Sequence, residues 1–354
     1  MDVETKVDLL LKRPTEELIT VADARSLFET KQHPNHYIGY EISGKLHMGS
    51  LIMASFKIKD LIEAGCNTSV FLADWHAWIN NKFEGDMDKM KLAGEYYREA
   101  FQLIDKKVKI DLGSDIYHDN DEYWKQVIQV SMNMSLGRAA KSVTIMGRKE
   151  GEATNLAQYI YAPMQAADIK AMDIDIAHAG MDQRKVHMLA RDVFPKLNWQ
   201  APVVMHHNLL PGLIKPEGQT QEEIEESAKM SKSKPWTAIF IHDSLDEIKK
   251  KLNKAWCPEK QVETNGVLQY VRDLVFHEFK SFDIERPEKF GGNASYENYE
   301  EVEKDFVNGK IHPADLKNSV AGYLDKIIAP YRDHFEKPKY AKLLDVYKDV
   351  EITR

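Results

Sequence analysis

The feature that most constrains the fold is a regular alternation of strand-like and helix-like segments in the first 110 residues. The runs YIGYEI (37–42) and TSVFLAD (68–74) are rich in aromatic and β-branched residues. Apolar residues with a helical period fill 47–64 between them and 86–107 after them. Strands that alternate with helices of this length predict a parallel, doubly wound sheet of the α/β class.

A second half of this sheet is expected after a helical insertion. From about residue 111 to 160 the pattern becomes polar with a helical period. The strand-like runs DIDIAHAG (173–180) and APVVMHH (201–207) then resume the alternation around a helical stretch at 181–194. The sheet domain is therefore expected to end near Ile241.

The remaining chain has the pattern of a helical domain. Ser244 and Glu247 open the first helical stretch with the spacing of a capping box, and Gly, Pro and Asn separate the helical periods that follow. The expected organisation is a helical N-terminal segment at 1–34, an α/β domain at 35–241 with an insertion at about 111–160, and an all-helical domain at 242–354.

Composition excludes several classes of protein. The chain is 43% hydrophobic and 29% charged, as in ordinary globular proteins, and its apolar runs are too short to span a membrane. The charged N-terminus does not resemble a signal peptide, so we expect a cytoplasmic protein. A net charge of −8 argues against bulk attraction to nucleic acid and leaves a local basic patch open.

Cysteine and histidine usage predicts no metal centre. The two cysteines, Cys66 and Cys257, lie far apart in sequence, so we expect two buried thiols instead of a disulfide framework or a paired-cysteine zinc site. The histidines, including His206 and His207, lack the spacing of zinc ligands.

Two short motifs flank the predicted sheet. GKLHMGS (44–50) follows the first strand, where glycines let the backbone approach a phosphate and His47 opens a helix whose N–H groups attract anions. KMSKS (229–233) follows the last strand, where two lysines could neutralise charge on a polyphosphate. Taken singly, the first motif is also typical of an ordinary turn and the second of a solvated charged run.

Together, in this order and spacing, the two motifs resemble those of class I aminoacyl-tRNA synthetases. Residues 159–189 narrow the resemblance to tyrosyl-tRNA synthetases of the archaeal and eukaryotic type, and it extends over about 35–335. It implies a Rossmann-like catalytic domain and an anticodon-binding C-terminal domain. Further matching stretches are YIGYE (37–41), FLADWHAW (71–78), KAWCPE (254–259), RPEKFGG (286–292) and HPADLKNSV (312–320).

The resemblance implies activation of L-tyrosine by ATP, accompanied by Mg²⁺, and transfer of the tyrosyl group to tRNA(Tyr). Since the attacking carboxylate is already ionised, positioning and charge stabilisation should suffice without a general base. The implied catalytic residues are His47, Lys229 and Lys232. These three would bind ATP together with Gly44, Gly49, Ser50 and Gly180. Ser50 departs from the family, which usually has a second histidine there.

The tyrosine pocket is expected on one helix. Tyr161, Gln165 and Asp168 follow each other at i, i+4 and i+7, which places them on one helix face. The resemblance implies that Asp168 and Tyr37 hold the phenolic hydroxyl of the substrate. It also implies that Tyr161, Gln165 and Gln183 surround its ammonium group.

The resemblance also implies contacts with tRNA and with a second subunit. Lys141 and Arg184 match positions that read the first acceptor-stem base pair, although arginine is common where Lys141 stands. Phe290 resembles an aromatic that stacks on the first anticodon base, and Asp315 a carboxylate that accepts hydrogen bonds from it. Relatives dimerise through the inserted helical segment, so a homodimer is expected.

Two alternatives remain from the sequence. A tryptophanyl-tRNA synthetase would share the fold and both motifs, but Tyr37 with Asp168 favours a phenol over an indole. A non-catalytic paralogue that binds RNA would be expected to lack the lysines of KMSKS, and both are present.

Overall fold

The computed structural model describes residues 1–147, 152–153, 155–218, 220, 224, 227–230 and 234–348. The chain forms two compact units. The first contains Met1–Gly44, Lys57–Asn208 and the C-terminal residues from Leu343, and the second contains Lys45–Phe56 and Leu209–Lys342. Helix α3 (Met48–Glu63) therefore begins in the second unit and ends in the first.

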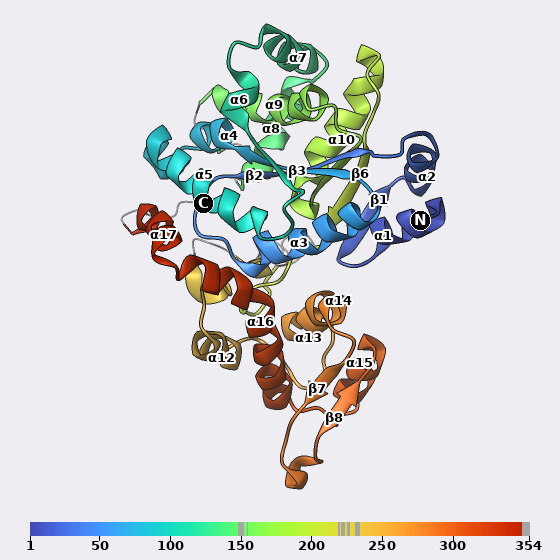
Figure 1. The fold of residues 1–354 in the computed structure, drawn as a ribbon, viewed down its shortest axis with the longest axis vertical. Helices are drawn as coiled ribbons and strands as arrows, with labels where there is room; N and C mark the ends of the chain where they lie inside the picture. The colour runs from blue at the N-terminus through green and yellow to red at the C-terminus, as the bar shows by residue number, and fades with distance from the viewer. Residues whose placement is uncertain are drawn as a thin grey trace. The chain divides into compact units, whose positions relative to one another are not determined.

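The first unit is built on a six-stranded sheet with the order β1-β6-β5-β2-β3-β4 (Figure 1). All neighbouring strands are parallel except β1, which pairs antiparallel with β6 at one edge. The chain moves outward from β2 to β4 and then returns to the other side of β2 with β5 and β6. This reversal confirms the predicted doubly wound sheet. The strands are β1 (Thr15–Ile19), β2 (Asn35–Glu41), β3 (Asn67–Ala73), β4 (Lys109–Leu112), β5 (Ile176–Gly180) and β6 (Val203–His207).

Helices cover both faces of this sheet (Figure 1). Alternate residues of a strand point to opposite faces. Tyr37 packs with the face that carries α9, whereas Ile176 packs with α1 and α2. The helices of this unit are α1 (Val3–Leu11), α2 (Val21–Thr30), α4 (Asp74–Ile79), α5 (Met87–Gln102), α6 (Gly113–Tyr117), α7 (Asp121–Met132), α8 (Leu136–Ser142), α9 (Ala157–Ala171) and α10 (Arg184–Val193).

The expectation of a purely helical N-terminal segment is wrong, because residues 15–19 form the edge strand β1. An edge strand needs only one partner and exposes one side to water. Its sequence, TEELI, therefore carries acidic residues that hide its strand character. Glu17 lies opposite His206 in the register of this pair.

The second unit is mostly helical, and Ser244 and Glu247 form the predicted capping box. The expectation that it is all-helical is wrong, because β7 (Phe282–Ile284) and β8 (Ala294–Tyr296) pair antiparallel. Strands of three residues are too short for a periodic signal. The helices of the second unit are α12 (Leu245–Asn253), α13 (Gly266–Tyr270), α14 (Phe276–Glu278), α15 (Tyr299–Val307), α16 (Pro313–Phe335) and α17 (Pro338–Ala341).

Short 3-10 helices and a π-helical segment, η6, lie between the longer elements. They include η1 (Lys82–Gly85), η2 (Val143–Met146), η3 (Met181–Gln183), η4 (Phe194–Leu197), η5 (Pro235–Thr237), η6 (Val271–Val275), η7 (Glu288–Phe290) and η8 (Lys342–Tyr347). Cys66 and Cys257 are buried free thiols, as predicted. Among the described residues, no helix is long and apolar enough to cross a membrane.

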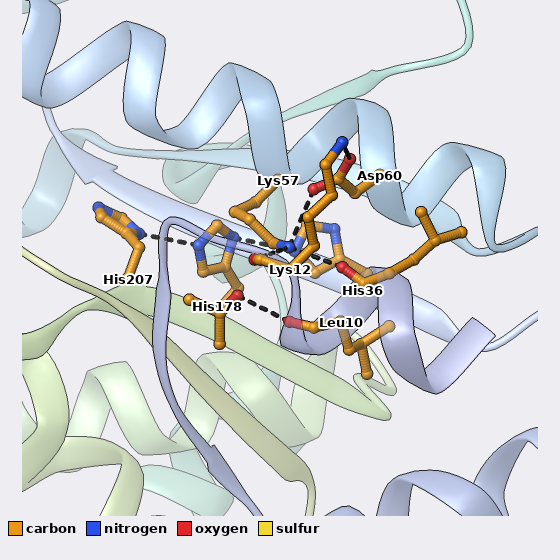
Figure 2. Close-up of polar contacts among 9 residues, drawn as sticks. Leu10, Lys12, His36, Lys57, Asp60, His178 and His207 are labelled. Carbon is orange, nitrogen blue, oxygen red and sulfur yellow. Dashed lines mark hydrogen bonds and ion pairs between the residues drawn. The ribbon is translucent and has the colours of Figure 1, made fainter. Parts of the chain in front are cut away.

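One buried polar cluster ties the N-terminal segment to helix α3 (Figure 2). The ammonium group of Lys57 donates to the carbonyls of Leu9 and Lys12 at 2.7 and 2.8 Å and to Asp60 at 2.9 Å. Because Leu9 and Lys12 lie at the end of α1, this lysine donates to carbonyls at a helix terminus, where donors from the helix itself are missing. We refer to Lys57 and Asp60 with these partners as the Lys57 cluster.

A row of three buried histidines lies beside the Lys57 cluster (Figure 2). His178 shares one hydrogen bond with His36 at 3.3 Å and one with His207 at 2.8 Å. Burial lowers the pKa of His36 and of His207 to about 3, so these imidazoles are neutral at neutral pH. The row links the neighbouring strands β2, β5 and β6 by side-chain contacts.

Candidate active site

Helix α9 places the predicted pocket residues together on one face of the first unit. Tyr161 and Asp168 are buried, and Gln165, between them, is partly buried. The Gln165 amide donates to Oε1 of Gln183 at 3.3 Å. The Tyr161 hydroxyl donates to Oε2 of Glu41 at 3.3 Å. Of the three residues predicted to surround an ammonium group, Tyr161 contacts the Glu41 carboxylate, and Gln165 and Gln183 contact each other.

Asp168 is fully buried, and its two carboxylate oxygens differ in their surroundings. Oδ1 accepts hydrogen bonds of 2.9 Å from the hydroxyls of Tyr117 and Tyr123. Among the described residues, Oδ2 has no hydrogen-bond partner, and the closest imidazole nitrogen, Nε2 of His76, is 3.7 Å away. Since a buried acceptor is costly to leave unpaired, Oδ2 is suited to a donor on a ligand.

Burial controls the protonation of the groups around this carboxylate. It raises the pKa of Asp168 to about 8, against the effect of the two tyrosine donors. It lowers the pKa of His76 to about 4, so that this ring is neutral at neutral pH. Burial and the nearby Asp168 carboxylate raise the pKa of Tyr37, which is 1% exposed. The Tyr37 hydroxyl therefore keeps its proton and can donate a hydrogen bond.

Other buried polar atoms without partners lie in the same part of the structure. Within the described residues they include Oε1 of Gln165, Oδ2 of Asp74 and both ring nitrogens of His76. The ring of His76 packs edge-on against Tyr161, with centroids 4.5 Å apart. An excess of unpaired polar atoms in one buried region is typical of a binding site for a polar ligand.

The glycine-rich motif opens helix α3 within the second unit. The backbone N–H of His47 donates to Oγ of Ser50 at 3.0 Å, and the Ser50 N–H donates to Nδ1 of His47 at 3.2 Å. Ser50, the departure from the family pattern, thus closes the first turn of the helix. A Cβ at Gly49 would lie 3.2 Å from the His47 ring, so glycine leaves that imidazole its space.

Two other glycines of the expected nucleotide site lie in the first unit. The carbonyl of Gly44 accepts a hydrogen bond of 2.9 Å from the Tyr97 hydroxyl. Gly180 ends strand β5 with an extended backbone, φ −70° and ψ 159°. Gly180 is thus at the carboxyl end of a parallel strand, the edge where ligands bind in sheets of this kind.

Lys229 is held by backbone pairing within the second unit. It forms an antiparallel bridge with Pro211, and the flanking Met230 N–H donates to the Leu210 carbonyl at 3.3 Å. A Cβ at Gly212 would lie 2.8 and 2.9 Å from two backbone oxygens, so only glycine allows this approach. The pairing fixes the start of the KMSKS motif. Residues 231–233, including Lys232, lie outside the described part of the chain.

The residues expected to contact tRNA lie on separate elements. In the first unit, Lys141 is exposed in α8, and Arg184 opens α10 and pairs with Glu17 at 2.8 Å. In the second unit, Phe290 is 61% exposed and Asp315 lies in the first turn of α16. A phenylalanine of the core would be buried, whereas this exposed ring is suited to stacking on a base.

Several side chains of this site carry no sequence signal of their own. Glu41 and His76 lie inside YIGYE and FLADWHAW, stretches that match the family without indicating what each residue does. Tyr117 and Tyr123 lie in the insertion, 51 and 45 residues before Asp168. No periodic pattern connects residues so far apart, so only the tertiary structure reveals their contact.

Comparisons with known proteins agree with this geometry. A family model described as tRNA synthetases class I (W and Y) matches residues 29–329. A tyrosine–tRNA ligase of Thermococcus onnurineus is 46% identical over the full length of both chains. The crystal structure of tyrosyl-tRNA synthetase from Pyrococcus horikoshii, complexed with L-tyrosine, is 44% identical, with a TM-score of 0.92 over 98% of this chain and all of that chain.

A more distant solved structure shares the fold of this chain at low sequence identity. The tryptophanyl-tRNA synthetase of Plasmodium falciparum has a TM-score of 0.68 at 15% identity, over 99% of this chain and 92% of that chain. At this identity the likeness concerns the fold and not the amino acid that is bound.

Proposed function

Because the chain belongs to the class I tRNA synthetases of the tryptophan and tyrosine family, we infer that it is a tyrosine–tRNA ligase. It activates L-tyrosine with ATP to tyrosyl-adenylate and transfers the tyrosyl group to tRNA. The observation that carries this assignment is the full-length similarity to tyrosine–tRNA ligases. The buried Asp168 supplies the chemical reason, since a phenol can donate to its unpaired oxygen.

We propose that the pocket binds tyrosine at both polar ends. Tyr37 and Asp168 hold the phenolic hydroxyl, and Tyr161, Gln165 and Gln183 surround the ammonium group. The hydrogen bond between Gln165 and Gln183 supports a common role for the two amides. An indole would place an N–H at a different distance from the ammonium group, so the tryptophan alternative is not favoured.

The chemistry needs positioning more than proton transfer. The tyrosine carboxylate attacks the α-phosphorus of ATP, the bond to the β-phosphate oxygen breaks, and pyrophosphate leaves. We propose that His47, Lys229 and Lys232 stabilise the charge that grows on the phosphates, with Mg²⁺ carried by ATP as part of the substrate. Further contacts to ATP are proposed for Gly44, Gly49, Ser50 and Gly180.

We propose that residues 35–241 form the catalytic domain and 242–354 the anticodon-binding domain. Lys141 and Arg184 would then read the acceptor stem, and Phe290 and Asp315 the anticodon. The exposure of Phe290 supports this role. Phe290→Ala and Asp315→Ala should impair charging of tRNA and leave tRNA-independent pyrophosphate exchange unchanged. Val307→Ala, which alters an exposed side chain on α15, is the matched control and should affect neither assay.

We propose a cytoplasmic homodimer that associates through the inserted helices. Ile128, Met132 and Leu136 of this insertion are 59%, 80% and 90% exposed, which is unusual for large apolar side chains in a monomer. In analytical ultracentrifugation the parent should sediment as a dimer and a Met132→Asp, Leu136→Asp variant as a monomer. Leu92→Asp, at a leucine 55% exposed outside the insertion, should remain dimeric. A monomeric parent would contradict the proposal.

Pyrophosphate exchange into ATP tests the amino acid. Each of the twenty amino acids is supplied in turn to the purified protein with ATP, Mg²⁺ and labelled pyrophosphate. Exchange should depend on tyrosine. Exchange with tryptophan alone would favour the sister enzyme, and exchange with none would favour a non-catalytic paralogue.

A further inference from the structure

Two tyrosines outside the expected pocket set converge on the carboxylate that would read the substrate. Tyr117 ends helix α6 and Tyr123 lies in α7, and both side chains are buried. Their rings stack with centroids 4.3 Å apart and an interplanar angle of 25°. Each hydroxyl donates to the same oxygen, Oδ1 of Asp168, at 2.9 Å.

This arrangement makes the two oxygens of Asp168 unequal. Two donors on Oδ1 fix the rotation of the carboxyl group about its last bond, because any turn would lengthen both hydrogen bonds. Oδ2 is left without a hydrogen bond among the described residues, and the atom is buried. The free acceptor is therefore oriented before a ligand arrives.

We propose that Tyr117 and Tyr123 are positioning residues for amino acid recognition, which saturate Oδ1 of Asp168 so that Oδ2 accepts the hydrogen bond from the phenol of the substrate. This inference rests on the proposed function, because it takes tyrosine to be the amino acid bound there. It assigns a specificity role to two residues of the inserted segment.

The charges around Asp168 are consistent with this role. Of the groups that face it, Tyr37 on β2 and Tyr161 on α9 are neutral hydroxyls with raised pKa values. On α4, the pKa of Asp74 is raised by burial and that of His76 is lowered to about 4. With no cation facing it from these elements, Asp168 has a pKa of about 8 and is largely protonated at neutral pH, and the hydroxyl donors are what favour its ionised, accepting form.

A purely structural reading is that the two rings only fill the core. They do pack against other aromatic side chains, since the Tyr117 ring lies 5.6 Å from Trp75 and the Tyr123 ring 5.2 Å from Trp124. Replacement by phenylalanine separates the two readings, because it keeps the ring and its packing and removes only the hydroxyl.

The test measures pyrophosphate exchange for Tyr117→Phe, Tyr123→Phe and the double variant. Each single change should raise the KM for tyrosine about three- to tenfold. The change removes one hydrogen bond to Asp168, and the substrate is affected only through Asp168. The KM for ATP and the kcat at saturating tyrosine should stay within about twofold. The preference for tyrosine over phenylalanine should shrink by about the same factor.

The double variant supplies a readout that packing alone would not change. With both donors removed, Asp168 accepts fewer hydrogen bonds and its pKa should rise further. Since the ionised Asp168 is the form that accepts from the substrate, the KM for tyrosine should fall as the pH rises through this pKa and then level off. In the double variant, this fall should occur at a higher pH than in the parent. Tyr96→Phe, at a fully buried tyrosine of α5, is the control and should leave this profile unchanged.

The outcomes distinguish this inference from the proposed function. If the parent protein shows no exchange with tyrosine, the proposed function fails before any variant is compared. If the parent exchanges with tyrosine but all three variants keep its KM, its preference and its pH profile, the positioning role is overturned and the proposed function stands. An equal rise of the KM values for ATP and tyrosine would also overturn it, in favour of a structural role.

Discussion

The Lys57 cluster and the Asp168 site are both buried and polar, and they lie on opposite faces of one sheet, yet they differ in how completely their atoms are paired. Lys57 places its three N–H bonds on two carbonyls and on Asp60 (Figure 2). Asp168 has two donors on one oxygen and none, among the described residues, on the other. The first arrangement is complete by itself, whereas the second still lacks a donor.

The difference separates a structural cluster from a binding site that looks similar in composition. A fully paired buried ion contributes to the fold, because removing one partner leaves the others buried and unpaired. A buried carboxyl group with one unpaired oxygen lowers stability in the empty protein and gains its missing partner from a ligand. The comparison thus predicts opposite effects for mutations in the two places.

The largest expected effect is on stability, at Lys57. Lys57→Met keeps the side-chain volume but removes a buried donor from Asp60 and from the α1 carbonyls, so the free energy of unfolding should fall by about 3 to 5 kcal/mol. Urea denaturation followed by circular dichroism measures this loss. The KM for tyrosine of the folded variant should equal that of the parent.

The matched control for Lys57 is Lys12→Ala. Lys12 contacts the same Asp60 at 3.1 Å, but its side chain is 44% exposed. The free energy of unfolding should change by about 0 to 1 kcal/mol, as for surface ion pairs. Equal losses for the two lysines would mean that burial of the pairing is not what makes Lys57 structural.

The next effect is on specificity, at Asp168. Asp168→Ala removes the acceptor for the phenol, so the KM for tyrosine should rise about 10- to 100-fold and the preference for tyrosine over phenylalanine should shrink. Pyrophosphate exchange with both amino acids measures the change. Gln165→Ala, on the same helix face, should weaken both amino acids alike. A full preference in Asp168→Ala would show that other residues read the phenol.

The sheet and the helix face of the pocket could be predicted because their signals are local. Alternating strands and helices indicate a doubly wound sheet, and the i, i+4, i+7 spacing of Tyr161, Gln165 and Asp168 places them together on α9. Both signals lie within a few turns or strands of the chain, where backbone periodicity decides which side chains meet.

What could not be predicted depends on contacts between distant residues or on very short elements. The donors Tyr117 and Tyr123 reach Asp168 only through the packing of α6 and α7 near α9. Likewise, a carbonyl that accepts a hydrogen bond from Lys57 belongs to another helix. Strand β1 has the composition of a polar loop and is defined by its pairing with β6. Such features follow from tertiary structure, which overrides local propensity.

A smaller effect concerns the pH dependence of stability. The pKa of Asp168 is raised from 3.8 to about 8 in the folded protein. Its contribution to stability is therefore fully present below pH 3.8 and is lost as the pH rises toward 8. Asp168→Asn carries no such charge, so its stability relative to the parent should grow with pH, by about 1 kcal/mol between pH 7 and pH 8. Urea denaturation at the two pH values measures this difference. A constant difference would contradict the raised pKa.

The smallest effect is expected at Tyr37, which lies on the pocket face of β2 and is proposed to share the phenol with Asp168. Tyr37→Phe removes one neutral hydroxyl and keeps the ring, so the KM for tyrosine should rise about three- to fivefold, less than for Asp168→Ala. The KM for phenylalanine, which offers no hydroxyl to Tyr37, should stay the same. Pyrophosphate exchange with both amino acids measures the split. If the two KM values rise together, Tyr37 shapes the pocket without reading the phenol, and Asp168 with its open Oδ2 alone carries the specificity.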